Sequence, residues 1–313
     1  MLAVYPDYYP DFSCIADRCR HSCCIGWEID IDPDSLARFH AVKGPMGQRL
    51  KESISLEEEP HFILGEGERC PFLNEKGLCD LILYGGEEIL CQICTDHPRY
   101  RSFLPGRTEI GVGLCCEAAG QLILSRKEPV RLCVTGKPEE IDPDGEYLAV
   151  LRQEALDMAQ DRDHPLAERE NALLERFGCW MPDLSPAQWA EVYLDLERLE
   201  DSWTTLLETL RDYGNEVDRE GFGRYMAGRE EEYEQLLVYF LYRHFLTAYE
   251  DGDVGSKVSF AVLSTRLLYL LGAIHWGNTG AFTFEDQVEY ARKYSAEIEY
   301  SQDNLDALFT MLM

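Results

Sequence analysis

Two different patterns of apolar positions divide the chain. In the C-terminal half, apolar residues recur every three or four positions, which predicts a series of helices. The segments 229–249 and 257–276 are apolar on more than one face, so we expect them at the centre of a helical bundle. The expected helical segments are 146–160, 165–177, 186–213 in one or two pieces, 229–249, 257–276 and a final region from Thr283 to Met313.

Capping signals support these helix boundaries. Ser185 followed by Pro186 gives a capping residue and then proline at the first helical position. The segment Thr283–Asp286 resembles a capping box. The acidic run 230–232 is expected on a solvated face near a helix start, where carboxylates interact favourably with the helix dipole.

The N-terminal part has shorter and more varied patterns. Residues 27–32 alternate apolar and acidic side chains, which predicts a half-buried strand that ends at Pro33. One or two helices are expected over 34–55, interrupted at Gly44-Pro45, and another over 113–126. Short β-like pieces are expected around 61–64 and 78–84.

The predicted fold class is α+β and mostly α. A cysteine-rich metal-binding module with short strands, residues 1–134, precedes an acidic helical bundle domain, residues 135–313. The segment 135–144 contains two prolines and four acidic residues and is expected to be the linker.

Charge restricts the possible partners. The 313 residues include 58 acidic and 29 basic side chains, for a net charge of −29, of which −7 lies in residues 1–134 and −22 in residues 135–313. Such a balance disfavours nucleic acid and anionic membranes, and favours a basic or lysine-bearing protein. The longest apolar stretch, 258–276, contains Arg266, so no membrane span is expected. The N-terminus lacks the pattern of a signal peptide, which predicts a cytoplasmic protein.

Eleven of the twelve cysteines precede residue 134, and most of them are clustered. A chain of 313 residues can bury a core without disulfide bonds, so thiols in a reducing cytosol favour metal or iron–sulfur binding over cystines. Simple patterns are absent: Gly26 stands where a radical S-adenosylmethionine loop needs its third cysteine, and only Cys91-x2-Cys94 has the form of a zinc knuckle. The glycine-rich segments 64–68 and 84–86 are expected to be ordinary turns rather than a Rossmann phosphate loop.

The order of the cysteine motifs resembles the flagellin lysine-N-methylase family, which is related to a wider CxxCxxCC group of zinc- or iron-chelating proteins. The residues that carry this resemblance are Phe12-x-Cys14-x4-Cys19-x3-Cys23-Cys24-x2-Trp27, Cys70-Pro-Phe-Leu73, Gly77-Leu-Cys79, Cys94-x3-Pro98-Arg99, Leu114-Cys115-x-Glu117-Ala-Ala119, and the segments 235–246 and 290–308. The resemblance implies an iron–sulfur protein with a [4Fe–4S] cluster that methylates lysine ε-amino groups of flagellin using S-adenosylmethionine.

The metal ligands implied by this resemblance outnumber the four that one cluster needs. A second metal, or supporting and redox roles for some thiols, are both open. Cys91 and Cys116 are not required by the family pattern, and Cys133 and Cys179 are expected to be small core side chains. The implied ligands are Cys14, Cys19, Cys23, Cys24, Cys70, Cys79, Cys94 and Cys115.

No catalytic residue is assigned from the sequence, and the oligomeric state is not predicted. Trp27, Glu28 and Arg99 lie beside the cysteine motifs, but structural roles are the stronger expectation for each. The same holds for the histidines: His97 and His275 are expected to pack, and His21 is a less favoured metal ligand. The alternative function is a non-enzymatic iron–sulfur or zinc-binding module with a redox or interaction role, and a purely structural zinc protein is a third possibility.

Overall fold

The computed structural model describes residues 2–57, 59–137 and 142–313. The chain forms two compact units, and each is described by itself. The larger unit comprises Met1–Phe12, Arg101–Cys115 and Ala119–Met313, and the smaller unit comprises Ser13–Tyr100 and Cys116–Ala118. The boundary expected at residue 134 falls inside a strand of the larger unit. Residues 138–141 of the expected linker lie outside the described residues.

A small sheet contributes to the larger unit. Its strands are β1 (Leu2–Pro6), β4 (Arg99–Leu104), β5 (Arg107–Val112) and β6 (Leu132–Thr135), in the order β4-β5-β1-β6. The N-terminal strand β1 runs parallel to β5, with Leu2 opposite Arg107, and antiparallel to β6, with Tyr5 opposite Cys133. The strand that opens the chain therefore lies inside the sheet.

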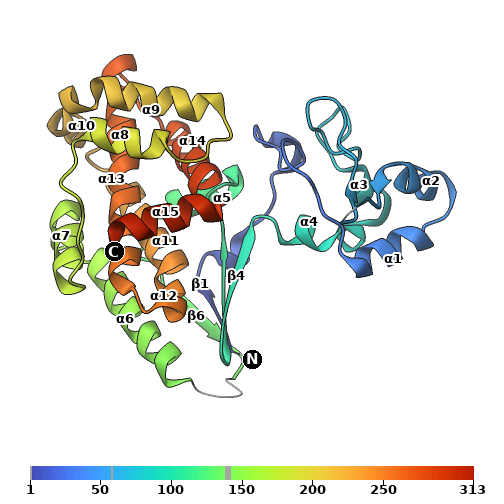
Figure 1. The fold of residues 1–313 in the computed structure, drawn as a ribbon, viewed down its shortest axis with the longest axis horizontal. Coiled ribbons are helices and arrows are strands. Elements are labelled where there is room, and N and C mark those ends of the chain that lie inside the picture. The colour runs from blue at the N-terminus through green and yellow to red at the C-terminus, as the bar shows by residue number, and fades with distance from the viewer. Residues whose placement is uncertain (1, 58, 138–141) are drawn as a thin grey trace. The chain divides into compact units, whose positions relative to one another are not determined.

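The rest of the larger unit is helical (Figure 1). Every helical segment expected in the C-terminal half is present, and a mostly helical chain with a small sheet confirms the predicted α+β, mostly α class. The helices are α5 (Glu117–Leu124), α6 (Pro143–Ala159), α7 (Leu166–Arg176), α8 (Pro186–Leu194), α9 (Asp201–Tyr213), α10 (Arg219–Tyr225), α11 (Glu231–His244), α12 (Ala248–Asp251), α13 (Val254–Thr279), α14 (Phe284–Tyr294) and α15 (Gln302–Leu312), with a π-helical segment at Ser295–Glu299.

Both predicted capping signals form. The Ser185 side chain accepts a hydrogen bond from the backbone of Gln188, whose side chain accepts one from the backbone of Ser185. Thr283 and Asp286 make the same reciprocal pair at the start of α14. Each box satisfies backbone N–H groups that the first helical turn leaves without partners.

Helices α11 and α13 form the centre of the helical bundle, as their apolar patterns predict. Helix α13 is the one described helix with the length and apolar composition of a membrane span, but 83% of its most apolar window is buried inside the protein. That burial is what the central helix of a globular core shows.

The expectation for the acidic run at the start of α11 holds only in part. Glu230 is exposed as expected, but Glu232 is only 3% exposed. Arg229, three residues earlier, donates two hydrogen bonds to the Glu232 carboxylate, at 2.7 and 2.8 Å. Burial of this carboxylate is tolerated because a paired guanidinium replaces its lost hydration.

Helix α11 is also fixed against the sheet by buried polar groups. The Tyr242 hydroxyl lies 3.0 Å from the carbonyl oxygens of Val4 in β1 and Ile110 in β5. Arg152 of α6 covers the Tyr242 ring at 4.9 Å and pairs with the buried Glu109 of β5 at 2.8 Å. These contacts join α6, α11 and two strands into one layered core.

The smaller unit consists of short elements around its own core. Its described elements are α1 (Pro33–Ala41), α2 (Gly44–Glu52), β2 (Ile54–Ser55), β3 (His61–Phe62), α3 (Asp80–Gly85) and α4 (Gln92–Asp96), with 3-10 turns at Ala16–Arg18 and Glu87–Ile89. The two helices expected over 34–55 are confirmed, and Gly44-Pro45 opens the second. The core is made of Ile29, Ile31, Phe39, Leu50, Phe62, Cys70, Phe72, Leu81 and Cys91.

Two strand expectations in this unit are wrong. Residues 27–32 bury Ile29 and Ile31 as the alternation predicts, but they form only an isolated bridge between Asp30 and His61. The neighbouring strand β3 has two residues, too few to extend a ladder. The β-like piece at 78–84 is instead largely helix α3, which starts directly after Cys79.

Candidate functional site

Five cysteines gather in the core of the smaller unit, and we call them the thiol core: Cys24, Cys70, Cys79, Cys91 and Cys94. Cys70 and Cys91 are buried among the apolar side chains, and the other three pack against the same cluster. All five are free thiols.

Short backbone contacts bring the thiol core together. The backbone N–H of Cys70 donates to the carbonyl of Cys24 at 2.8 Å, and Cys79 forms a bridge with Leu73, three residues after Cys70. Cys91 caps the short helix α4, so that its sulfur lies 3.3 Å from the sulfur of Cys94. Residues far apart in the sequence thus contribute to one apolar cluster.

The surroundings of these thiols shift their pKa values in different directions. A hydrogen bond from Cys23 lowers the pKa of Cys24 to about 7, against the opposing effect of burial. Burial raises the pKa of Cys70 to about 12 and also raises the pKa of Cys79. The hydrogen bond with Cys94 lowers the pKa of Cys91.

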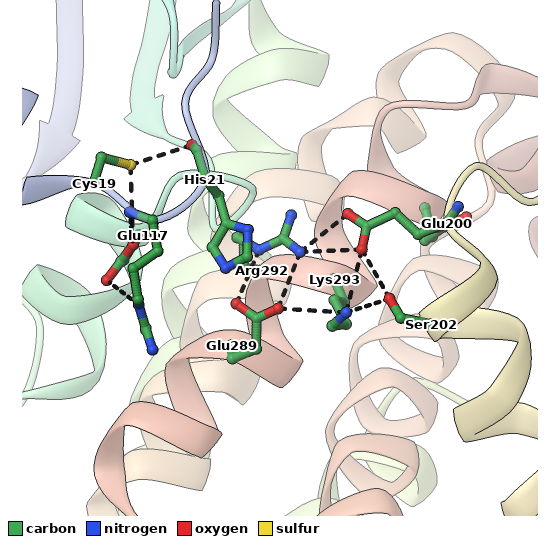
Figure 2. Close-up of polar contacts among 10 residues, drawn as sticks. Cys19, His21, Glu117, Glu200, Ser202, Glu289, Arg292 and Lys293 are labelled. Carbon is green, nitrogen blue, oxygen red and sulfur yellow. Dashed lines mark hydrogen bonds and ion pairs between the residues drawn. The ribbon is translucent and has the colours of Figure 1, made fainter. Parts of the chain in front are cut away.

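A second group of cysteines lies around Cys23. The hydrogen bond to Cys24, burial and the nearby Cys14 and Cys116 thiols all raise the pKa of Cys23. Cys19 donates to the carbonyl oxygen of His21 at 3.2 Å and lies 3.9 Å from the Glu117 carboxylate, as Figure 2 shows.

Glu117 organises this segment of the smaller unit. Its buried carboxylate accepts hydrogen bonds from the Arg20 backbone and from Arg20 Nε, both at 2.9 Å. The loop that carries Cys19 is therefore held by a charge-assisted pair rather than by a regular element.

The predicted ligand set is brought together only in part. Cys24, Cys70, Cys79 and Cys94 share the thiol core, which also includes Cys91, a residue the family pattern does not require. Cys14, Cys19 and Cys23 lie in the same unit outside that core, while Cys115 belongs to the larger unit. Within the described residues, no three histidine, cysteine or acidic side chains are arranged to hold a metal ion.

Cys115 has a different environment in the larger unit. Its thiol hydrogen-bonds the Tyr300 hydroxyl, and the Arg243 guanidinium lies 5.0 Å above the Tyr300 ring. Gly113 completes the cluster, because a Cβ atom there would meet Tyr300 Oη at 2.5 Å and Arg243 Nη1 at 3.1 Å. The polar groups of two helical segments thus converge on the end of β5.

A buried ionic network lies behind this cluster. Glu299, in the π-helical segment, accepts hydrogen bonds from His244 at 2.7 Å and Tyr239 at 2.9 Å, and pairs with Arg243 at 3.3 Å. Burial alone would raise the pKa of Glu299, but Arg243 and His244 more than offset it and the pKa is lowered. Burial also lowers the pKa of His244, so the pair is a carboxylate beside a neutral imidazole near neutral pH.

Spacing along the sequence does not predict this network, because Glu299 lies more than fifty residues after Tyr239, Arg243 and His244, which share helix α11. The only local indication was the helical periodicity of the segments that carry them. A π-helical segment is a frequent feature of functional sites.

Residues beside the cysteine motifs have structural roles. Trp27 Nε1 donates to the Cys23 carbonyl at 2.7 Å, and its ring lies 6.2 Å from that of His97. Arg99 donates to the Thr95 carbonyl at 3.2 Å, and Glu28 lies 3.7 Å from His61.

Two further groups of polar contacts lie in the larger unit. His275 hydrogen-bonds Tyr290 at 2.8 Å, which confirms the expected packed histidine. Figure 2 also shows Arg292 of α14 between two carboxylates, Glu200 at 3.0 Å and Glu289 at 3.1 Å, a pairing that secures the segment before α9.

The larger unit also contains a cavity of about 630 Å³ between α7, α8, α10 and α13. Its lining combines leucine and aromatic side chains with four charged residues. The sequence did not predict this cavity, because its lining residues come from five separate segments.

The fold and these sites define a class: a mostly helical protein with a separate thiol-rich unit. Residues 183–313 match the family model described as the FliB lysine N-methylase C-terminal domain. The predicted resemblance to flagellin lysine-N-methylases is therefore confirmed, and the family model matches this C-terminal part of the chain.

Individual proteins that resemble this chain do so at modest sequence identity. Lysine-N-methylases of Salmonella choleraesuis (strain SC-B67) and Salmonella typhimurium (strain LT2) are each 25% identical over 134 residues, which is 41% of this chain and 33% of theirs. The flagellar biosynthetic protein FliU of Salmonella muenchen is 25% identical over 134 residues, which is 41% of this chain and 79% of FliU. The match thus spans about a third of the length of the two lysine-N-methylases. No solved structure matches the chain significantly.

Proposed function

We propose that this protein is a cytoplasmic protein-lysine N-methyltransferase that uses S-adenosylmethionine as methyl donor and flagellin as substrate. The observation that carries the proposal is the match of residues 183–313 to the lysine N-methylase C-terminal domain. The names of the similar Salmonella proteins, lysine-N-methylase and flagellar biosynthetic protein, support the reaction and the substrate.

The proposed reaction is a displacement at the methyl carbon. A neutral lysine Nζ forms the new N–C bond while the S–C bond of the donor breaks and its electron pair stays on sulfur. The products are methyl-lysine, S-adenosylhomocysteine and one proton, which leaves the nitrogen for a base or water. Because the lysine must be deprotonated first, surroundings that lower its pKa favour the reaction.

The charge of the chain supports a lysine-bearing substrate. Residues 135–313 carry a net charge of −22. A strongly acidic surface attracts a basic segment and increases the rate of encounter.

The five free thiols of the thiol core favour a bound metal or iron–sulfur centre in the smaller unit, although no three described side chains are already arranged as metal ligands. Thiolates are the ligands of iron–sulfur clusters and of structural zinc. A [4Fe–4S] cluster takes four of them, and the thiol core supplies five free sulfurs, with Cys24 and Cys91 the most readily ionised because their pKa values are lowered. We therefore expect the ligands among Cys24, Cys70, Cys79, Cys91 and Cys94, and zinc is the alternative metal. An iron–sulfur cluster would supply electron-transfer or Lewis-acid chemistry.

Methyl transfer is tested by incubating the full chain with flagellin and S-adenosylmethionine and measuring peptide masses. The expected result is a gain of methyl increments on lysine residues. A substrate with its lysines blocked by acetylation is the control. Flagellin that gains no methyl groups from anaerobically prepared, metal-loaded protein contradicts the proposed reaction.

The metal centre is tested separately by iron, acid-labile sulfide and zinc analysis of anaerobically purified protein. Cys70→Ser and Cys91→Ser should lose most of the metal, because each removes a ligand from the thiol core. Cys179→Ser, which changes a free cysteine of the larger unit, is the matched control and should retain it. Equal metal content in all variants contradicts the assignment.

A second candidate is a non-enzymatic redox module, and the Cys91 and Cys94 sulfurs at 3.3 Å favour it. Such a pair is suited to a thiol–disulfide cycle. A protein that forms this disulfide reversibly with a glutathione buffer but methylates no lysine would support the second candidate over the first.

A further inference from the structure

The cavity of the larger unit takes no part in any function described so far. It is bounded by α7, α8, α10, α11, α13 and the segment 181–184, and its volume is about 630 Å³. Pockets of about 300–1,000 Å³ that are mainly apolar with a few polar groups are typical sites for small molecules. All of its α8, α10 and α13 walls lie in residues 183–313, the part that matches the methylase domain.

Rigid aromatic side chains form part of the wall. Tyr269 donates a hydrogen bond from its hydroxyl to the Arg219 carbonyl at 2.9 Å, and its ring lies 5.2 Å from Tyr233 and 5.0 Å from Phe222. Trp189 of α8 also lines the cavity, and it is 7% exposed. Flat rings held in this way can stack on a planar ligand without losing side-chain entropy.

The charged residues of the cavity fall into two kinds. Arg266 and Glu170 neutralise each other, because Arg266 Nε donates to the Glu170 carboxylate at 2.7 Å. Arg219 and Asp183 are exposed, and within the described part of the chain neither side chain makes a hydrogen bond or ion pair. The cavity therefore offers one available cation and one available anion beside apolar and aromatic walls.

We propose that this cavity binds S-adenosylmethionine, an inference that rests on the proposed methyltransferase function. Its α-carboxylate pairs with Arg219, its α-ammonium group pairs with Asp183, and its adenine ring packs between the aromatic and leucine side chains. An amino acid zwitterion joined to a flat base has the same mixture of groups that the cavity presents. No Rossmann motif is then needed, because the site is built from helix faces.

Binding of S-adenosylhomocysteine to the full chain, measured by isothermal titration calorimetry, tests the proposal. Arg219→Ala and Asp183→Asn should each weaken binding about tenfold or more, because each removes a charge-assisted hydrogen bond. Ala167→Trp, at an exposed position of the lining, should abolish binding by filling the mouth of the cavity. The matched controls are Arg224→Ala on α10 and Ala172→Trp on α7, both exposed and outside the lining, and they should bind as the wild type does.

Competition with adenosine and with methionine, the two parts of the ligand, tests which cavity residues contact which part. Adenosine should compete equally with the wild type and with Arg219→Ala, whereas methionine should compete only with the wild type. Affinity for S-adenosylhomocysteine that is unchanged in Arg219→Ala, Asp183→Asn and Ala167→Trp overturns the site, even where flagellin is methylated. The site is also overturned if the wild-type protein methylates flagellin but S-adenosylhomocysteine does not bind in this cavity. Binding that follows the expected pattern in a protein that methylates nothing supports the site and refutes the proposed reaction instead.

Discussion

At the scale of residues, the most demanding feature is the buried carboxylate of Glu299. It has no exposed side-chain surface, and His244, Tyr239 and Arg243 supply its hydrogen bonds and charge compensation. A buried charge costs free energy unless it is paired, so each member of this network depends on the others. Stability and pH dependence should both respond to it.

Glu299→Ala should lower the free energy of unfolding by about 3–5 kcal/mol, because Arg243, His244 and Tyr239 all lose the buried carboxylate that they contact. Urea unfolding followed by circular dichroism measures this change. Glu191→Ala is the control, since Glu191 is exposed and lies 3.8 Å from Arg211, a surface pair worth less than about 1 kcal/mol. If the two variants lose similar amounts of unfolding free energy, the buried network contributes no more to stability than a surface ion pair.

The pKa of His244 is below its ordinary value, so the folded protein resists a proton that the unfolded chain accepts. The free energy of unfolding should therefore decrease as the pH falls from about 7.5 to about 5.5, through the ordinary histidine pKa of about 6.5. The stabilisation from Glu299, whose pKa is also lowered, is lost at still lower pH. His244→Gln should flatten the dependence above about pH 5.5 in urea titrations, and an unchanged slope would count against this assignment.

At the scale of elements, the end of β5 is fitted closely to helix α11 and the segment after α14. Gly113 is the contact point, because the space beside its Cα is already occupied by Tyr300, Arg243 and Cys115. The contact holds a strand of the sheet against the helical layer.

Gly113→Ala should therefore destabilise the protein by about 1–3 kcal/mol, as overpacking of a tight contact does. Gly277→Ala is the matched control in α13, where a Cβ meets nothing within 4 Å. That substitution should be neutral or stabilise by up to about 1 kcal/mol, because alanine favours the helix. Thermal unfolding of both variants decides the point, and equal melting temperatures would show that the Gly113 contact is not tight.

At the scale of the whole molecule, the two units are stabilised differently. The larger unit has an extended apolar and aromatic core centred on α11 and α13. The core of the smaller unit is small and includes the thiol core. A bound metal would replace apolar packing that this unit lacks.

Metal removal by an anaerobic chelator should therefore affect the units unequally. Amide hydrogen exchange should speed up across residues 13–100, while α13 keeps its protection. Protein from the Cys91→Ser variant, treated in the same way, should already show fast exchange in 13–100 before the chelator is added. Unchanged exchange in that range on full metal removal would argue against a structural role for the metal.

Sequence patterns alone were enough to predict most helices of the C-terminal half and both capping boxes. Those features are local, since periodicity, capping residues and proline positions act within a few residues. The alternation at 27–32 predicted the burial of Ile29 and Ile31 but not the absence of a ladder, because a strand needs a partner of sufficient length.

Which side chains meet in space depends on how the chain packs. Cys91 joins Cys24 and Cys70 in the thiol core, Cys115 falls in the other unit, and Glu299 meets His244 across more than fifty residues. The cavity that we assign to the methyl donor likewise exists only where helices pack against each other. Such encounters depend on how the whole chain packs, and spacing along one sequence carries no information about them.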